Sequence, residues 1–137
     1  MKIILSTILA IFLASCAGTG KNLQILMEDM ESDQTLVFVK RSTGFFGSAP
    51  TIQIKLNGQE VARLGSNEST SVPGKTGQNV LNVGYTGLAS IGMNRPSKQF
   101  QLDEGGKKFF IIKQDVKIIG PPELKLYMLD KDDFFSD

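Results

Sequence analysis

Cys16, the only cysteine in the chain, is the residue whose side-chain chemistry and position stand out. The sequence of 137 residues contains no histidine and no tryptophan. Without histidine a Ser-His-Asp triad is excluded, and the usual nitrogen and sulfur ligands of a zinc or copper site are missing. We therefore expect a protein that is not an enzyme and that holds no metal and no cofactor. What remains is the chemistry of one thiol.

An apolar run leads directly to this thiol. After Lys2, residues 3–13 are apolar apart from one serine and one threonine. A helix needs about 20 apolar residues to span a bilayer, whereas a short positive start and an apolar core of about 7–15 residues are typical of a secretory signal peptide. We expect residues 1–15 to be cleaved as a signal peptide.

The stretch Leu13-Ala14-Ser15-Cys16 resembles the lipobox of bacterial lipoproteins, in which a leucine and two small residues precede a cysteine. In that family the thiol receives a diacylglyceryl group, the peptide is cut before the cysteine, and the new amino terminus is usually acylated, for example with palmitate. The resemblance implies that Cys16 is the lipidation site, and two or three acyl chains make a permanent anchor. A buried free cysteine is the alternative.

The residue after the lipidated cysteine decides sorting in Gram-negative bacteria, where aspartate retains a lipoprotein in the inner membrane. Here that residue is Ala17. The resemblance therefore implies an outer-membrane lipoprotein on the periplasmic face, which has the membrane as one partner through its lipid anchor.

The composition after cleavage fits one domain. Removing residues 1–15 leaves 122 residues, and the 15 basic and 14 acidic residues of the whole chain nearly balance. A core of useful size fits this length. The absence of a concentrated basic stripe argues against nucleic acid as a partner. We expect a lipidated tether and a short helix or arm over 16–34, and a β-sandwich domain over 35–137.

The segment after the tether has helical spacing. Residues 17–21 are small and flexible in type, as a tether requires. Leu23, Leu26, Met27 and Met30 then follow at i, i+3, i+4 and i+7, with Asn22 as the expected cap of the helix. Two interpretations stay open for residues 22–34: a short helix or arm lying on the domain, or an exposed segment that docks a partner.

From residue 35 onward, short apolar runs rich in β-branched and aromatic residues alternate with Gly, Pro and Asn turns, which indicates an all-β fold. The expected strands are residues 35–41, 51–56, 60–64, 69–72, 79–85, 97–102, 107–114 and 124–129. We predict a single antiparallel β-sandwich of seven or eight strands, immunoglobulin-like or transthyretin-like, with the short N-terminal helix or arm outside it. The run at 109–112 does not alternate, so we expect it in a central strand covered on both faces.

Two local patterns add detail to this fold. Asn57-Gly58 is the favoured two-residue hairpin turn, and either a bulge after Val61 or a longer loop is needed to bring Leu64 to the core. The final residues 129–137 suggest a capping turn or short helix whose Phe134-Phe135 pair closes the bottom of the core.

One loop is a candidate contact site. Residues 41–50 join the first two strands, and Phe45 and Phe46 are flanked by glycines. One interpretation is that the rings close the open end of the core. The other is a partner-binding loop, in which Arg41 and Phe46 act as polar and apolar anchors beside Phe45.

The sandwich segment also resembles a bacterial lipoprotein family. The stretches RSTGFFGSA, LNGQEVARL, VPGKTG and FQLDEGGKKFFI resemble the lipoproteins grouped as domain of unknown function 2846, over roughly residues 35–129. The same stretches are similar to PEGA-like β-sandwich domains. The resemblance implies a sandwich architecture and carries over no catalytic residue. The segment 65–71 keeps a glycine but lacks the usual aromatic residue.

Taken together, these observations predict a non-catalytic binding or assembly accessory, anchored by lipid to the outer membrane, with an envelope protein as partner. A periplasmic inhibitor or immunity lipoprotein that blocks a toxin or a cell-wall hydrolase is one alternative. The sandwich lipoprotein of a secretion machine is the other.

Overall fold

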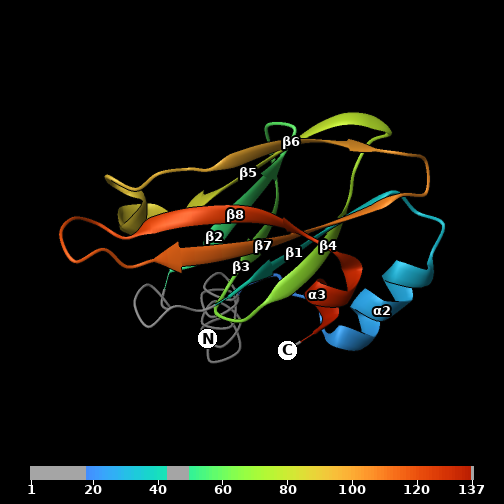
Figure 1. Ribbon diagram of the computed structural model, residues 1–137, viewed down its shortest axis with the longest axis horizontal. Helices are drawn as coiled ribbons and strands as arrows, with labels where there is room; N and C mark the ends of the chain where they lie inside the picture. Colours follow the sequence, from blue (N-terminus) through green and yellow to red (C-terminus); the bar gives the residue numbers. More distant parts are fainter. Residues whose placement is uncertain (1–17, 43–49, 137) are drawn as a thin grey trace, which may run out of the picture.

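The computed structural model of the protein describes residues 18–42 and 50–136 (Figure 1). The elements in chain order are α2 (Leu23–Glu31), β1 (Leu36–Arg41), β2 (Ile52–Leu56), β3 (Gln59–Leu64), β4 (Ser69–Pro73), β5 (Gly77–Tyr85), the 3-10 helix η1 (Gly87–Ser90), β6 (Ser97–Leu102), β7 (Lys107–Asp115), β8 (Glu123–Leu129) and α3 (Lys131–Phe135). The all-β sandwich and its strands are confirmed, most with bounds within one residue of those expected.

The described residues form two four-stranded sheets. Sheet A has the order β4-β1-β7-β8 and sheet B the order β3-β2-β5-β6. One pair departs from the antiparallel expectation, because β1 runs parallel to β7, with Arg41 beside Ile112. Alternation within a strand specifies which face is buried but not the direction of a neighbour that lies some seventy residues away in the chain, which is why the sequence missed this pair.

The β2–β3 hairpin contains the expected turn and the expected bulge. Asn57 and Gly58 have φ values of 54° and 84°, the positive values that such a turn needs. The register shifts between Ile54 and Lys55, which leaves Val61 as the unpaired residue. Leu64 is thereby returned to the core, where it is fully buried.

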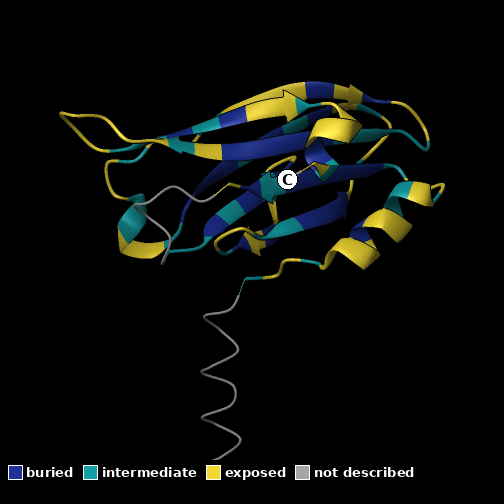
Figure 2. Ribbon diagram, turned by 60° about the horizontal axis from the view of Figure 1, so that its bottom comes forward, coloured by how far each residue is buried: buried dark blue, intermediate teal, exposed yellow. Residues whose placement is uncertain are grey.

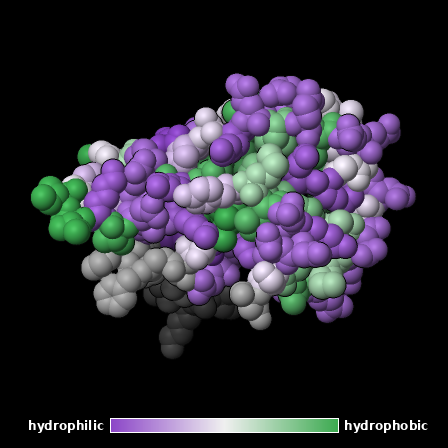
Figure 3. Space-filling view, in the orientation of Figure 1, coloured by the Kyte–Doolittle hydropathy of each residue, from purple (hydrophilic) through white to green (hydrophobic). Residues whose placement is uncertain are grey.

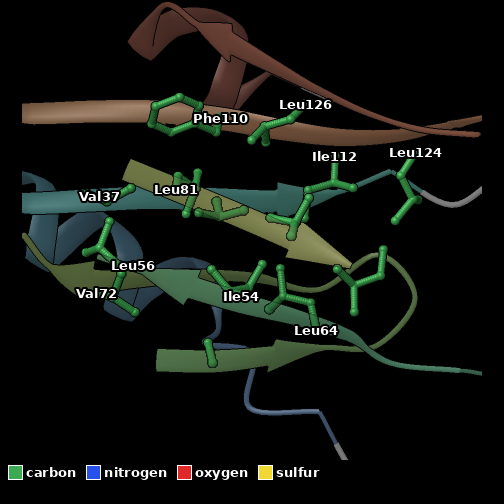
Figure 4. Close-up of a cluster of buried hydrophobic side chains, with 14 of the residues drawn as sticks. Val37, Ile54, Leu56, Leu64, Val72, Leu81, Phe110, Ile112, Leu124 and Leu126 are labelled. Atoms are coloured by element: carbon green, nitrogen blue, oxygen red, sulfur yellow. The ribbon is translucent and has the colours of Figure 1, made fainter. Parts of the chain in front are cut away.

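The main core lies between the two sheets (Figure 4). Sheet B contributes the alternating residues Ile52, Ile54 and Leu56, and sheet A faces them with residues such as Phe110 and Ile112. Each fully buried side chain of this size stabilises the fold by about 1.5–3 kcal/mol. Since no disulfide is available from a single cysteine, apolar packing of this kind must hold the sheets together.

A second hydrophobic cluster lies on the outer face of sheet A, beneath α2 and α3. We call this region the helix face. Phe38 and Phe109 point outward from the sheet with their ring centroids 4.9 Å apart, and Leu26 of α2 and Phe134 of α3 cover them. The prediction of a central strand covered on both faces is confirmed for β7. Phe134 belongs to this outer cluster rather than to the bottom of the main core.

Lysine side chains fasten the helices to sheet A. Lys40 Nζ donates to the carbonyl oxygens of Asp133 and Phe134, at 3.2 and 2.9 Å, at the end of α3. Lys107 Nζ donates to the carbonyl oxygens of Ser32 and Gln34, at 2.8 and 2.6 Å, just after α2. Carbonyls at the end of a helix have no amide partner further along it, so the lysines act as C-terminal caps.

Candidate functional site

The residues predicted to do chemistry or to contact a partner are only partly described by the structure. Cys16, Phe45 and Phe46 lie outside the described residues, and only Arg41 has a described position. The lipidation site and the aromatic half of the partner-binding loop therefore stay predictions.

Arg41 lies in the interior, with 5% of its surface exposed. Its Nη1 donates to the carbonyl oxygens of Pro50 and Leu64, at 2.8 and 3.0 Å, and its guanidinium stands over the Tyr85 ring with Cζ 5.8 Å from the centroid. This side chain links the end of β1 in sheet A to strand ends of sheet B. The expectation of an exposed polar anchor at Arg41 is thus corrected: the guanidinium is used to satisfy buried backbone carbonyls.

The electrostatics around Arg41 agree with this position. Burial lowers the pKa of the Arg41 guanidinium from its ordinary value, and the nearby Tyr85 and Glu68 oppose that change. Burial likewise raises the pKa of the Tyr85 hydroxyl, which is hydrogen-bonded to Gln114 Oε1 at 2.6 Å. In both groups burial is the largest cause of the shift, as expected for side chains that lie in the interior.

The segment expected to be a flexible tether is bound to the domain from Gly18 onward. The Thr19 amide donates to the Arg63 carbonyl of β3 at 2.6 Å, and the Arg63 amide donates back to Thr19 Oγ1 at 2.9 Å. Two residues later the Lys21 amide donates to the Ser69 carbonyl of β4 at 2.7 Å. Residues 18–21 therefore bridge the outer strands of the two sheets, and the expectation of a free tether is wrong for them.

Glycines in this segment are required by a close approach to Glu68. The Gly20 amide donates to Glu68 Oε2 at 2.6 Å. A Cβ added at Gly18, Gly20 or Gly65 would collide with the Glu68 carboxylate. The small residues that suggested a flexible tether instead allow the backbone to pack tightly around the Glu68 carboxylate.

Helix α2 divides its apolar stripe between the domain and the solvent (Figure 2). The Asn22 cap is confirmed, since Asn22 Oδ1 accepts from the Ile25 amide at 2.9 Å. Leu26 is buried in the outer cluster, whereas Leu23 is 62% and Met27 52% exposed. The helix therefore lies on the domain, as the first interpretation expected, and still presents half of its stripe outward, while docking of a partner stays a prediction.

The exposed half of the stripe forms a shallow depression with acidic residues beside it. Leu23 and Met27 line it together with Gln24, Glu28 and Glu31. On the opposite flank of the helix, Asp29 is held by Lys21 Nζ at 3.3 Å and by the hydroxyl of Ser71 in β4. Hydrogen bonds of this kind fix the rotation of α2 on the sheet, so the depression has a defined orientation.

Sequence reasoning missed a second exposed apolar region, formed by two loops. Residues 86–96 carry Leu88 and Ile91, and the β7–β8 connection carries Ile118 and Ile119; all four side chains are strongly exposed. The signal available in the sequence was the presence of large aliphatic residues in segments rich in glycine and proline, where turns usually carry polar residues. We call this region the loop end.

Metal ligands do not gather in the described part of the chain. Within residues 18–42 and 50–136, no group of three or more aspartate, glutamate, cysteine or histidine side chains could hold a metal ion. Among the same residues, no helix has the length and apolar character needed to cross a bilayer.

Comparisons with known proteins add no relative. No family model, no curated protein and no solved structure matches the chain.

Proposed function

We propose that the chain is a lipoprotein anchored through Cys16 to the periplasmic face of the outer membrane, where it acts as a non-catalytic binding or assembly accessory. The signal peptide over 1–15, the lipobox Leu13–Cys16 and the following Ala17 support the anchor and its location. The docked segment 18–21 supports a domain held close to its anchor.

The observation that carries the binding role is the uncovered stripe of α2. Leu23 and Met27 stay exposed although their neighbour Leu26 is packed into the outer cluster. A methionine and a leucine on a rigid helix offer a partner apolar area at little cost in ordering, because the helix is already fixed by its cap and by the Asp29 contacts.

The acidic residues beside the stripe define the chemistry of the partner. Glu28 and Glu31 line the depression next to Met27. The complementary surface is an apolar side chain flanked by lysine or arginine, because opposite charges at the rim guide association and reject other partners. The proposed partner is an envelope protein with such a basic and apolar patch.

The test is chemical crosslinking of the native, lipidated protein in membranes, followed by purification of the captured protein. The wild type is compared with the double variant Leu23→Ser/Met27→Ser and with the control Met128→Ser, which removes a methionine of similar exposure from β8. We expect one envelope protein to be captured by the wild type and the control and lost from the double variant. Capture that is unchanged in the double variant would exclude this surface.

The anchor is tested separately. We expect acyl chains, seen in the intact mass of the wild type, to be absent from Cys16→Ser, because the chain has no other thiol for thioether formation. A wild-type mass without acyl chains would contradict lipidation at Cys16.

A further inference from the structure

The loop end exposes aliphatic side chains on two separate turns. Ile118 is fully exposed, and Ile119, Leu88 and Ile91 are exposed to 89%, 86% and 75%. Val116, at the start of the β7–β8 connection, is more than half exposed. Figure 3 shows hydrophobic side chains at the tip where Figure 1 places this connection. A group of bare aliphatic residues in a folded domain marks a surface that contacts another apolar phase.

The two turns are tied to each other by hydrogen bonds. Asn94, beside η1, donates from Nδ2 to the Leu124 carbonyl at 2.8 Å and accepts from the Leu124 amide at 2.9 Å. Tyr85, just before η1, is bonded to Gln114 near the end of β7. These hydrogen bonds form the base of the loop end: they connect the two turns that hold the exposed aliphatic residues, and they join sheet A to sheet B.

The carboxylates behind the tips are paired with lysines. Lys117 Nζ lies 3.2 Å from Glu123, and Lys125 Nζ lies 2.7 Å from Asp115. Lys113 stands over the Tyr127 ring at 5.9 Å. Together with Arg95 in the neighbouring loop, these groups leave a small positive excess, in contrast to the acidic depression on α2. Aliphatic tips beside lysine and arginine suit the boundary between the headgroups and the acyl chains of a bilayer that contains anionic lipid.

The chain enters the domain on the edge strand of sheet B, at the level where β5 ends. Thr19 is bonded to Arg63, Arg63 lies opposite Gln53, and Gln53 lies opposite Gly84. Gly84 is followed three residues later by η1. Along the strand direction, Thr19 therefore lies level with the end of β5, two strands away across sheet B.

Little chain separates that point from the expected lipid. Only Ala17 stands between Gly18 and Cys16 in the sequence. Two residues of extended chain span at most about 7 Å. An anchor at Cys16 would therefore hold the domain close to the bilayer.

We propose that the loop end contacts the lipid bilayer in which Cys16 is anchored, with Leu88, Ile91, Ile118 and Ile119 entering the headgroup region. This inference rests on the proposed lipidation of Cys16. The contact and the anchor together fix the orientation of the sandwich, and the depression on α2 stays outside the bilayer, available to a protein partner.

The test uses the full lipidated protein in vesicles composed mainly of phosphatidylethanolamine with a minor share of phosphatidylglycerol. Because lipidation consumes the only native thiol, Ile118→Cys, Leu88→Cys and the control Met27→Cys each provide a single labelling position for an environment-sensitive fluorophore. Quenching is measured with a nitroxide on the lipid acyl chain and with a soluble quencher. We expect several-fold stronger lipid-borne quenching at positions 118 and 88 than at position 27.

A second variant tests the contact itself. Ile118→Asp/Ile119→Asp, carrying the label at position 88, should stay in the membrane fraction through its lipid and lose the lipid-borne quenching. An unchanged signal would overturn the proposal, because the tip would then not hold the loop end at the bilayer.

The outcomes separate the two proposals. The intact mass of the protein reports the acyl chains, and a mass without them overturns both the lipid anchor and this contact. If the protein is lipidated but its labels at positions 118 and 88 are quenched only by the soluble quencher, the bilayer contact is overturned and the lipid anchor is not. Equal lipid-borne quenching at position 27 also overturns it, since the domain would then have no preferred orientation.

Discussion

The helix face and the loop end both leave large apolar side chains uncovered, yet they support them differently. On the helix face, Leu23 and Met27 stand on a capped helix that is fixed by a buried aromatic cluster and bordered by glutamates. At the loop end, aliphatic residues stand on turns whose base is held by hydrogen bonds and whose carboxylates are paired with lysines. Exposure alone therefore does not define an interaction surface: the charge beside the apolar side chains and the rigidity of the backbone beneath them indicate the kind of partner.

The largest effect is expected from removing the support of the helix face. Phe38 is fully buried and packs against Phe109 and Phe134. Phe38→Ala should lower the free energy of unfolding by about 3–5 kcal/mol, because it leaves a cavity under both helices. Denaturation in urea measures this change.

The matched control for this prediction is Val61→Ala, at the bulge of β3, where the side chain is partly exposed. Should the two variants differ by less than about 1 kcal/mol, the cluster under the helices would not be a second core.

An intermediate effect is expected at the buried Arg41, whose guanidinium stands over the ring of Tyr85 at the base of the loop end. Arg41→Met keeps the aliphatic stem but leaves the carbonyls of Pro50 and Leu64 without their donor. We expect a loss of about 2 kcal/mol in the free energy of unfolding, because buried acceptors without partners are costly. Denaturation together with hydrogen exchange at the start of β2 measures it.

For comparison, Arg63→Met removes an arginine whose side chain is half exposed and paired with Glu60. It should change stability less than Arg41→Met does. The reverse order would restore Arg41 as a candidate for surface contacts.

The smallest effect is expected at the Asp29 contact that orients α2. The hydrogen bond from the Ser71 hydroxyl, and to a smaller extent the contact with Lys21, lowers the pKa of the Asp29 carboxyl. The ionised carboxylate therefore stabilises the folded state at pH values above the pKa that Asp29 has in the unfolded state. This contribution is lost as the pH falls through the lower pKa of the folded state. Asp29→Asn should reduce stability at neutral pH by at most about 1 kcal/mol, since the pair is partly exposed. Denaturation curves measured from neutral to acidic pH should show that the difference in unfolding free energy between the wild type and Asp29→Asn becomes smaller as the pH falls.

Glu104→Gln, in the exposed turn between β6 and β7, serves as the control for a general loss of negative charge. A gap between wild type and Asp29→Asn that is the same at acidic and neutral pH would show that the ionised carboxylate does not hold the helix.

The strands and turns could be predicted from the sequence because their signals are local. Alternation at Ile52, Ile54 and Leu56 specifies a buried face, and Asn57-Gly58 specifies a tight turn. The bulge at Val61 was also within reach, because a single extra residue was needed to place Leu64 in the core.

The remaining features depend on contacts between distant residues. Nothing near Arg41 in the sequence shows that carbonyls at positions 50 and 64 meet its guanidinium. The glycines at 18 and 20 have the composition of a tether, and only the approach of Glu68 shows that they are packed. The candidate site was therefore less predictable than the fold, because its surfaces depend on which residues tertiary contacts cover.

The bridge formed by residues 18–21 has a consequence for how the domain survives in a crowded compartment. β3 and β4 are the outermost strands of their sheets on one side, and unpaired strand edges invite pairing with other chains. Thr19 and Lys21 occupy backbone positions on both edges. A processed chain that begins at Cys16 would keep this cover. Proteolytic trimming by a few further residues would expose both strand edges together and make the domain prone to aggregate.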